Sequence, residues 1–216
     1  MSNYLFDSTI ASEVAGILLG CEAVKLSPDA PFQWSSGWKS PIYCDNRVAL
    51  SFPKERTKIK ELLVKLIQEK FADVEAIAGV ATAGIPQGAL VADMLGLPFL
   101  YVRSKPKSHG MTNQIEGRLV KGQKVVMLED LISTGGSSLS AVKALKAAGA
   151  EVLGLAAIFN YGFEVADDNF ADEQVPFYTL GDYASLITLA LSEGKIDLSK
   201  KDSLDSWRQD PAHWKG

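Results

Sequence analysis

The stretch from residue 125 to residue 138 is the sequence feature that most restricts how this chain can fold. An apolar run over 125–128 leads into two adjacent acids, Glu129 and Asp130. A turn rich in hydroxyls and glycine follows, and a helical pattern then runs over 138–148. A strand, a short turn and a helix in this order are typical of a βα unit.

The turn has the composition of an anion site. The first N–H groups of a helix are unpaired and lie at the positive end of its dipole, so they attract anions. Gly135 and Gly136 allow positive φ and a close approach of the backbone to a phosphate. Glu129 and Asp130 are acceptors when ionised, which suits ribose hydroxyls. The candidate hydroxyl donors are Ser133, Thr134, Ser137 and Ser138. A phosphorylated ribose is the predicted ligand.

Other interpretations of this turn are less consistent with the residues present. A Walker-type loop needs Gly-Lys-Ser/Thr, and no lysine occurs between Lys124 and Lys143. The dinucleotide fingerprint G-x-G-x-x-G is also missing. The remaining alternative is an ordinary βα turn with helix-capping serines and a solvated acidic pair.

Regular apolar patterns predict the rest of the fold. Amphipathic helices are expected over 11–19 and 59–67. From residue 75 the pattern alternates between strands, at 76–81, 98–102, 125–128, 152–159 and 177–180, and helices, at 85–95, 138–148 and 183–191. Continuous apolar strands between helices indicate an α/β fold whose parallel sheet is covered on both faces. Ligands of such sheets bind beyond the carboxyl ends of the strands.

The chain length of 216 residues predicts a single domain, 1–216. Within it, residues 20–52 are expected to form a small N-terminal hood subdomain. Residues 195–216 are expected to form a tail with a short helix packed by its tryptophans and no assigned function.

Charge and cysteine content exclude several classes of function. The net charge of −4 makes a nucleic-acid surface unfavourable, and positive charge must be concentrated wherever a polyanion binds. Cys21 and Cys44 form no C-x-x-C pair, and the two histidines form no metal-binding pattern, so no metal-ligating residues are predicted. With no signal or membrane segment, a cytoplasmic protein without membrane contact is expected.

Residues 103–121 interrupt the alternation and lack clear periodicity. A loop of this length inside a compact domain is usually functional or disordered. It carries Arg103, Lys105, Lys107 and His109, with glycines as possible hinges. A solvated basic loop is one interpretation, and a cationic flap that pairs with pyrophosphate and excludes water is the other.

Four segments carry a resemblance to a known family. Residues 129–136, Glu-Asp-Leu-Ile-Ser-Thr-Gly-Gly, resemble the motif that binds 5-phosphoribosyl 1-pyrophosphate (PRPP) in type I phosphoribosyltransferases. Segments 32–41, 82–86 and 101–117 narrow the resemblance to orotate phosphoribosyltransferases. The matches occur in family order over roughly residues 30–160. The implied fold is the type I phosphoribosyltransferase fold with a hood.

The resemblance implies a reaction and roles for residues. PRPP would transfer its phosphoribosyl group to orotate, giving orotidine 5′-monophosphate and pyrophosphate, with Mg²⁺ as cofactor. Catalytic roles fall to Lys107, His109, Glu129 and Asp130. The PRPP site would comprise Arg103, Lys107, His109, Glu129, Asp130, Leu131, Ile132, Ser133, Thr134, Gly135, Gly136 and Ser137. Orotate would contact Ser133, Phe32 and Tyr43. In the family the basic loop closes over the neighbouring subunit's site, which implies a homodimer; the sequence itself does not show one.

The chain departs from the family pattern at several positions. Many members have lysines where this chain has Ser35, Ala83 and Ser104, and some have an arginine near orotate where it has Tyr161. Possible substitutes are Lys39, Lys105 and Arg47. Two other functions stay open: a purine phosphoribosyltransferase with another base pocket, and a regulator that senses PRPP without catalysis.

Overall fold

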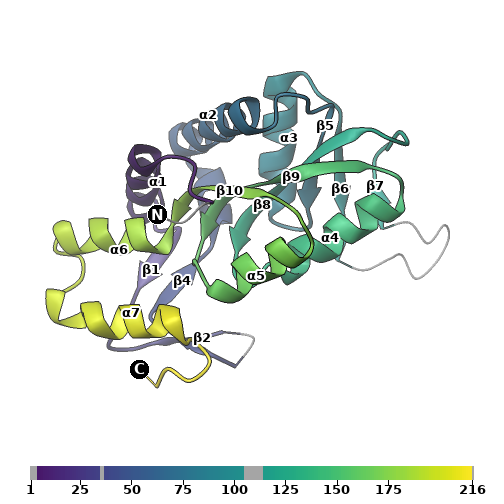
Figure 1. Cartoon of the computed structure of the whole chain (residues 1–216). Helices are drawn as coiled ribbons and strands as arrows, with labels where there is room; N and C mark the ends of the chain where they lie inside the picture. Colours follow the sequence, from purple (N-terminus) through teal and green to yellow (C-terminus); the bar gives the residue numbers. More distant parts are fainter. Residues whose placement is uncertain (1–3, 35–36, 105–113, 216) are drawn as a thin grey trace.

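A six-stranded sheet forms the centre of the molecule (Figure 1). The computed structural model describes residues 4–34, 37–104 and 114–215. The strand order is β10-β9-β8-β5-β6-β7. The strands are β5 (Ala76–Val80), β6 (Phe99–Val102), β7 (Ile115–Glu116), β8 (Lys124–Ile132), β9 (Glu151–Asn160) and β10 (Phe177–Asp182). All pairings are parallel except that of β7 with β6. The predicted parallel sheet is confirmed, although β7 lies in a segment predicted as loop.

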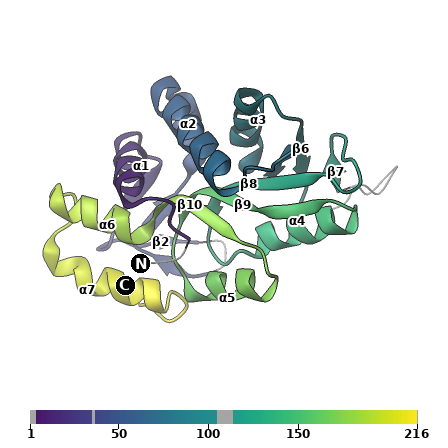
Figure 2. The same ribbon diagram turned by 45° about the horizontal axis from the view of Figure 1, so that its top comes forward.

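Helices cover both faces of the sheet, as predicted. Figures 1 and 2 show α1 (Ser8–Gly20), α2 (Pro53–Lys70) and α3 (Gly84–Leu95) on one face, and α4 (Gly136–Ala147) and α5 (Glu164–Asp172) on the other. The helix α6 (Tyr183–Ser192) packs beside α1. Along β8, Val126 and Leu128 belong to the apolar cluster under α1–α3, whereas Val125 and Met127 belong to the opposite cluster. This period of two is the signature of a strand buried on both sides.

The predicted helices are present, most with somewhat wider bounds, whereas α4 begins two residues earlier and ends one residue earlier than predicted. Asp7 accepts a hydrogen bond from the Ile10 amide and begins α1, and Pro53 occupies the first turn of α2. Gly96, at φ +65°, ends α3. The helix α5 is not among the predicted elements.

The N-terminal region predicted as a hood contains two small antiparallel sheets. One pairs β1 (Val24–Leu26) with β4 (Ile42–Cys44), and the other pairs β2 (Phe32–Gln33) with β3 (Lys39–Ser40). The 3₁₀ helix η1 (Asn46–Ser51) leads from β4 into α2. Sheets of two short strands are marginal alone and need packing partners. One partner is α7 (Lys201–Gln209), which follows the 3₁₀ helix η2 (Leu198–Lys200); Figure 1 places it beside β2.

The order of the strands fixes where a ligand can bind. From β5 the chain runs outward to β6 and β7, then returns to β8 on the other side of β5 and continues to β9 and β10. The loops that follow β5 and β8 therefore run in opposite directions from the carboxyl ends of these two neighbouring strands. The crevice between two such loops is the usual ligand position in open α/β sheets. The acid pair and the glycine turn both lie at this switch point.

A search of the described helices finds none that combines the length and the apolar character needed to span a bilayer.

Candidate active site

Glu129 and Asp130 lie inside β8 rather than after it. The sequence predicts that this strand ends at residue 128, but β9 is long enough to pair with β8 as far as Ile132. The two side chains stay close enough to interact, because the charge of Asp130 acts on the carboxyl of Glu129. Glu129 is 5% exposed and Asp130 is partly exposed. The two neighbouring acids therefore occupy unlike environments.

Hydrogen bonds fix the buried acid. One carboxylate oxygen of Glu129 accepts from the Asp130 amide at 3.2 Å, and the other accepts from the Ser138 hydroxyl at 3.1 Å. The sequence places Ser138 among the anion donors, but the structure buries it against Glu129. Desolvation by burial, followed by the charge of Asp130, raises the pKa of Glu129 well above its ordinary value. Burial also raises the pKa of Asp130. The pair consequently binds protons more readily than two solvated carboxyls.

The turn after β8 is open to an anion. Gly135 is the N-cap of α4 and, at φ +80°, has no side chain to accept bonds from the first amides. A Cβ there would lie 2.7 Å from the ring of Phe170, so both conformation and space require glycine. Gly136 and Ser137 are exposed. Amides at the start of α4 can therefore donate to a phosphate.

Two asparagines hold the backbone on either side of the turn. Asn46 of η1 donates from Nδ2 to the Asp130 carbonyl at 2.7 Å, and Asn169 of α5 donates to the Thr134 carbonyl at 2.9 Å. The sequence interpretation identifies neither residue, because each contact joins distant positions and leaves no local pattern. Both side chains reduce the freedom of the segment that carries the acids and the anion turn.

The loop after β5 packs directly on β8. Gly84, the first residue of α3, comes so close that a Cβ would lie 2.4 Å from the Leu128 carbonyl oxygen. The segment 82–86, one of the family-like segments, therefore adjoins the acid pair. The starts of α3 and α4 both face the carboxyl edge of the sheet.

A cavity of about 590 Å³ lies between the N-terminal sheets and the turn after β8. Its described lining comprises Gln33, Trp34, Trp38, Tyr43, Cys44, Leu131, Ser133, Thr134 and Tyr161. Two of the three residues predicted to contact the base, Tyr43 and Ser133, thus lie on one cavity. The third, Phe32, packs against Tyr43 with ring centroids 5.8 Å apart. The cavity has flat aromatic sides and a polar edge, which suits a planar heterocycle.

The described residues that line this cavity include no lysine or arginine. Arg47, a predicted substitute cation, forms a two-pronged ion pair with Asp45 at 2.7 and 2.9 Å. Lys39 donates to the carbonyl of Lys215 at 3.1 Å. Burial raises the pKa of Tyr161 well above its ordinary value, so its hydroxyl stays protonated at neutral pH.

The remaining predicted PRPP residues have different positions. Leu131 lines the cavity, but the side chain of Ile132 is buried in the apolar cluster between the sheet and the helices α4 and α5. Arg103 follows β6, with Nη1 3.7 Å from a carboxylate oxygen of Glu116 on β7. Lys107 and His109 lie outside the described residues, as do Ser35 and Lys105.

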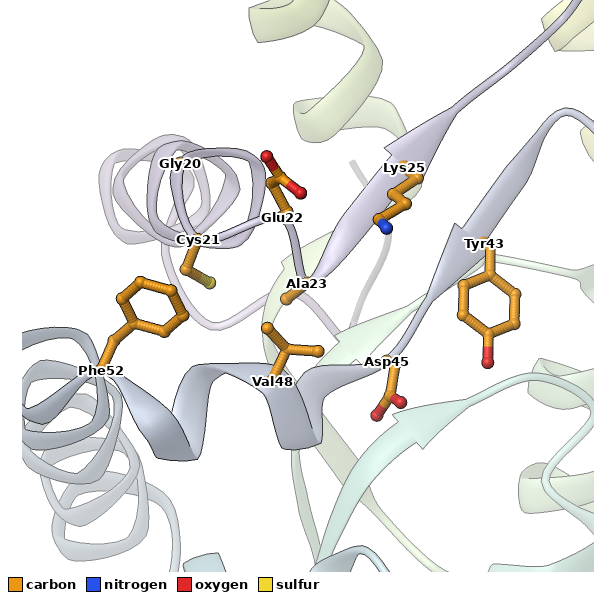
Figure 3. Close-up of a pocket in the computed structure, with 9 residues that line it drawn as sticks. All are labelled: Gly20, Cys21, Glu22, Ala23, Lys25, Tyr43, Asp45, Val48 and Phe52. Atoms are coloured by element: carbon orange, nitrogen blue, oxygen red, sulfur yellow. The ribbon is translucent and has the colours of Figure 1, made fainter.

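A second cavity, of about 640 Å³, lies on the N-terminal region (Figure 3). Figure 3 shows Lys25 and Tyr43 on the adjacent strands β1 and β4, and Cys21 and Phe52 together at the other end. Tyr43 lines both cavities. Tyr43 and Phe52 are 44% and 40% exposed, which is high for aromatic side chains.

Comparisons with known proteins point in one direction. Residues 50–176 match the phosphoribosyl transferase domain family. The chain is 54% identical over 203 residues to an orotate phosphoribosyltransferase of Cytophaga hutchinsonii, covering 94% of this chain and 97% of that protein. It is 57% identical to one of Staphylococcus aureus, covering 94% of this chain and all of that protein. The crystal structure of orotate phosphoribosyltransferase from Aeropyrum pernix is similar with a TM-score of 0.74 and 30% identity, over 85% of this chain and 99% of that one.

Proposed function

This chain belongs to the orotate phosphoribosyltransferase family of the type I phosphoribosyltransferases, and from that premise we propose how its site works. The reaction transfers the 5-phosphoribosyl group of PRPP to orotate in UMP biosynthesis, and it releases pyrophosphate. The observation that carries the site assignment is the placement of the acid pair, the anion turn and the aromatic cavity at one switch point of the sheet.

PRPP is held by its hydroxyls and its 5′-phosphate. Asp130, the more exposed acid, accepts from the ribose hydroxyls, and Glu129 supports it from the buried side. The amides at the start of α4, with hydroxyls from Ser133, Thr134 and Ser137, bind the 5′-phosphate. Arg103, Lys107 and His109 contact the pyrophosphate. The open N-cap at Gly135 and the partial exposure of Asp130 support this arrangement.

Orotate lies in the aromatic cavity of about 590 Å³, called the base cavity below, against Tyr43 and Ser133. The bond from C1 of the ribose to a pyrophosphate oxygen breaks, and a ring nitrogen of orotate forms the new bond to C1 while its N–H proton passes to the departing pyrophosphate or to solvent. The ribose ring carries positive charge in the transition state, so no covalent nucleophile is needed. Catalysis comes from alignment of the two substrates and from the negative charge of the acid pair beside the ribose.

Mg²⁺ fits this site as a cofactor that arrives with the substrate. Carboxylate oxygens suit this hard cation, which keeps several waters and prefers few protein ligands together with substrate phosphates. The described residues contain no group of three or more candidate metal ligands, and the acid pair offers oxygen donors only. When bound, the ion neutralises charge on the departing pyrophosphate.

The assay for this function is direct. The purified chain with PRPP, Mg²⁺ and orotate should consume orotate, followed as loss of its ultraviolet absorbance, and EDTA should stop the reaction. Adenine and guanine serve as control bases and should not react. Reaction with a purine but not with orotate would favour the purine enzyme. Binding of PRPP without turnover of any base would favour the regulator.

We also propose that the chain works as a homodimer. The exposed aromatic rings of Tyr43 and Phe52 beside the cavity of Figure 3 support this, because such rings are typical of protein interfaces. This surface borders the base cavity, so a second copy there could reach the active site. One chain has a mass of 23.3 kDa, and light scattering should give twice this value. A monomer that is fully active at the same concentration would exclude shared sites.

We propose a cytoplasmic location because the two cysteines form no disulfide. Cys21 and Cys44 are both free thiols, which is the usual state in a reducing compartment. Cell fractionation should recover the activity with the cytoplasm, and recovery with an oxidising compartment would contradict the assignment.

A further inference from the structure

The C-terminal helix α7 packs against the base cavity although it lies outside the matched domain, residues 50–176. Its two fully buried residues, Leu204 and Trp207, face the protein. The Tyr183 hydroxyl donates to the Leu204 carbonyl at 3.1 Å, and Arg208 donates from Nη1 to the Gly162 carbonyl at 3.2 Å. These bonds attach α7 to the start of α6 and to the segment that follows β9.

Trp207 is the centre of an aromatic cluster formed by Trp34, Tyr161, Phe163 and Trp207. Its ring centroid lies 5.7 Å from those of Trp34 and Tyr161, at interplanar angles of 86° and 83°. Phe163 lies 5.4 Å away. Edge-to-face contacts of this kind are favourable and have a defined geometry. The indole N–H of Trp207 also donates to the Lys39 carbonyl of β3 at 3.1 Å.

Two members of this aromatic cluster line the base cavity. Trp34 and Tyr161 contact each other at 5.0 Å and share the cavity with Ser133 and Thr134. Trp34 follows β2, and its indole N–H donates to the Ile42 carbonyl at 3.2 Å. Trp207 lies behind both rings and makes its own bond to β3. A single residue of α7 thus contacts both the N-terminal sheets and the segment after β9.

We infer that Trp207 is a positioning residue for base binding, and that α7 is a structural part of the base site. Without Trp207, the rings of Trp34 and Tyr161 would lose their common support and the short β2–β3 sheet would lose a hydrogen bond. The anion turn and the acid pair take their support from Asn46, Asn169 and Ser138 instead. Affinity for the base therefore depends on α7, whereas affinity for PRPP does not.

The test rests on the proposed function and uses steady-state kinetics of the full chain. Trp207→Leu should raise the KM for orotate about fivefold to tenfold through the lost ring contacts, and leave the KM for PRPP within about twofold. Trp207→Phe keeps an aromatic ring and should recover most of the affinity for orotate. Arg208→Gln, which leaves the core intact, should raise the KM for orotate about twofold. Arg208 is partly buried and outside the aromatic cluster, so this variant reports on the attachment of α7 even when Trp207→Leu folds poorly.

The control is Ile67→Ala on α2, a fully buried residue near the amino edge of the sheet. This variant should lower the melting temperature, but it should not raise the KM for orotate relative to the KM for PRPP. A double variant with Trp34→Phe should raise the KM for orotate by less than the product of the single effects, because Trp207 acts through Trp34. Equal changes in both KM values, or no change in either, would overturn the inference. Absence of orotate turnover in the unmodified chain would instead refute the proposed function.

Discussion

Replacement of Asp130 by asparagine should lower kcat by about 10²- to 10³-fold, a loss of roughly 3–4 kcal/mol of transition-state stabilisation. The variant keeps the shape of the side chain and the backbone bond from Asn46 to residue 130. It removes the negative charge beside the ribose at the moment when the ring becomes positive. Initial rates of orotate consumption at saturating PRPP measure the effect.

Asp73→Asn is the matched control for this variant. Asp73 lies before β5 at the opposite edge of the sheet, where its carboxylate is 3.5 Å from the Lys124 ammonium. The same chemical change there should leave turnover unaltered. Thermal unfolding should show that both variants fold. Turnover of the Asp130 variant within about threefold of the unmodified chain would exclude its carboxylate from the reaction.

Replacement of Glu129 by glutamine should stabilise the folded chain at alkaline pH while it lowers activity. Burial raises the pKa of Glu129 in the folded chain, so above the ordinary value of 4.5 the folded chain binds more protons than the unfolded chain. The free energy of unfolding therefore falls as pH rises through the raised pKa. Glutamine is neutral at every pH, can accept from the Asp130 amide and can donate to Ser138. Its melting temperature should exceed that of the unmodified chain by roughly 2–4 °C at pH 8, the shift expected for about 1 kcal/mol.

Melting curves between about pH 5 and pH 8.5 test this linkage. The difference between the two proteins should grow as pH rises and should shrink toward pH 5. Glu61→Gln, at an exposed position of α2, is the control and should follow the unmodified chain at every pH. Parallel curves for the Glu129 variant and the unmodified chain would mean that Glu129 is not a source of instability.

Local patterns are sufficient to predict five of the six strands of the sheet, most helices and the position of the anion turn. The apolar strands, the glycine that ends α3 and the residues 133–137 all signal their structure within a few positions. The end of β8 was predicted four residues too early, because two acids resemble the end of a strand. Only pairing with β9 shows that they remain within the sheet.

The supporting residues could not be predicted in the same way. Asn46, Asn169 and Trp207 act on positions far away in sequence, at separations of 84, 35 and 168 residues. No periodicity relates such partners, since tertiary packing alone brings them together. The sequence predicts a short helix in the C-terminal tail that is packed by its tryptophans. The structure has this helix, α7, with Trp207 fully buried. The contact of Trp207 with the residues of the base cavity arises from tertiary packing and leaves no local pattern.

The fit of Gly84 against the Leu128 carbonyl has a mechanical consequence. With no space for even one methyl group between them, the loop after β5 and the acid-bearing strand form a rigid floor of constant width. The start of α3 and the acid-bearing strand cannot move closer together, so the spacing between the loop after β5 and the acid pair is fixed by backbone contact.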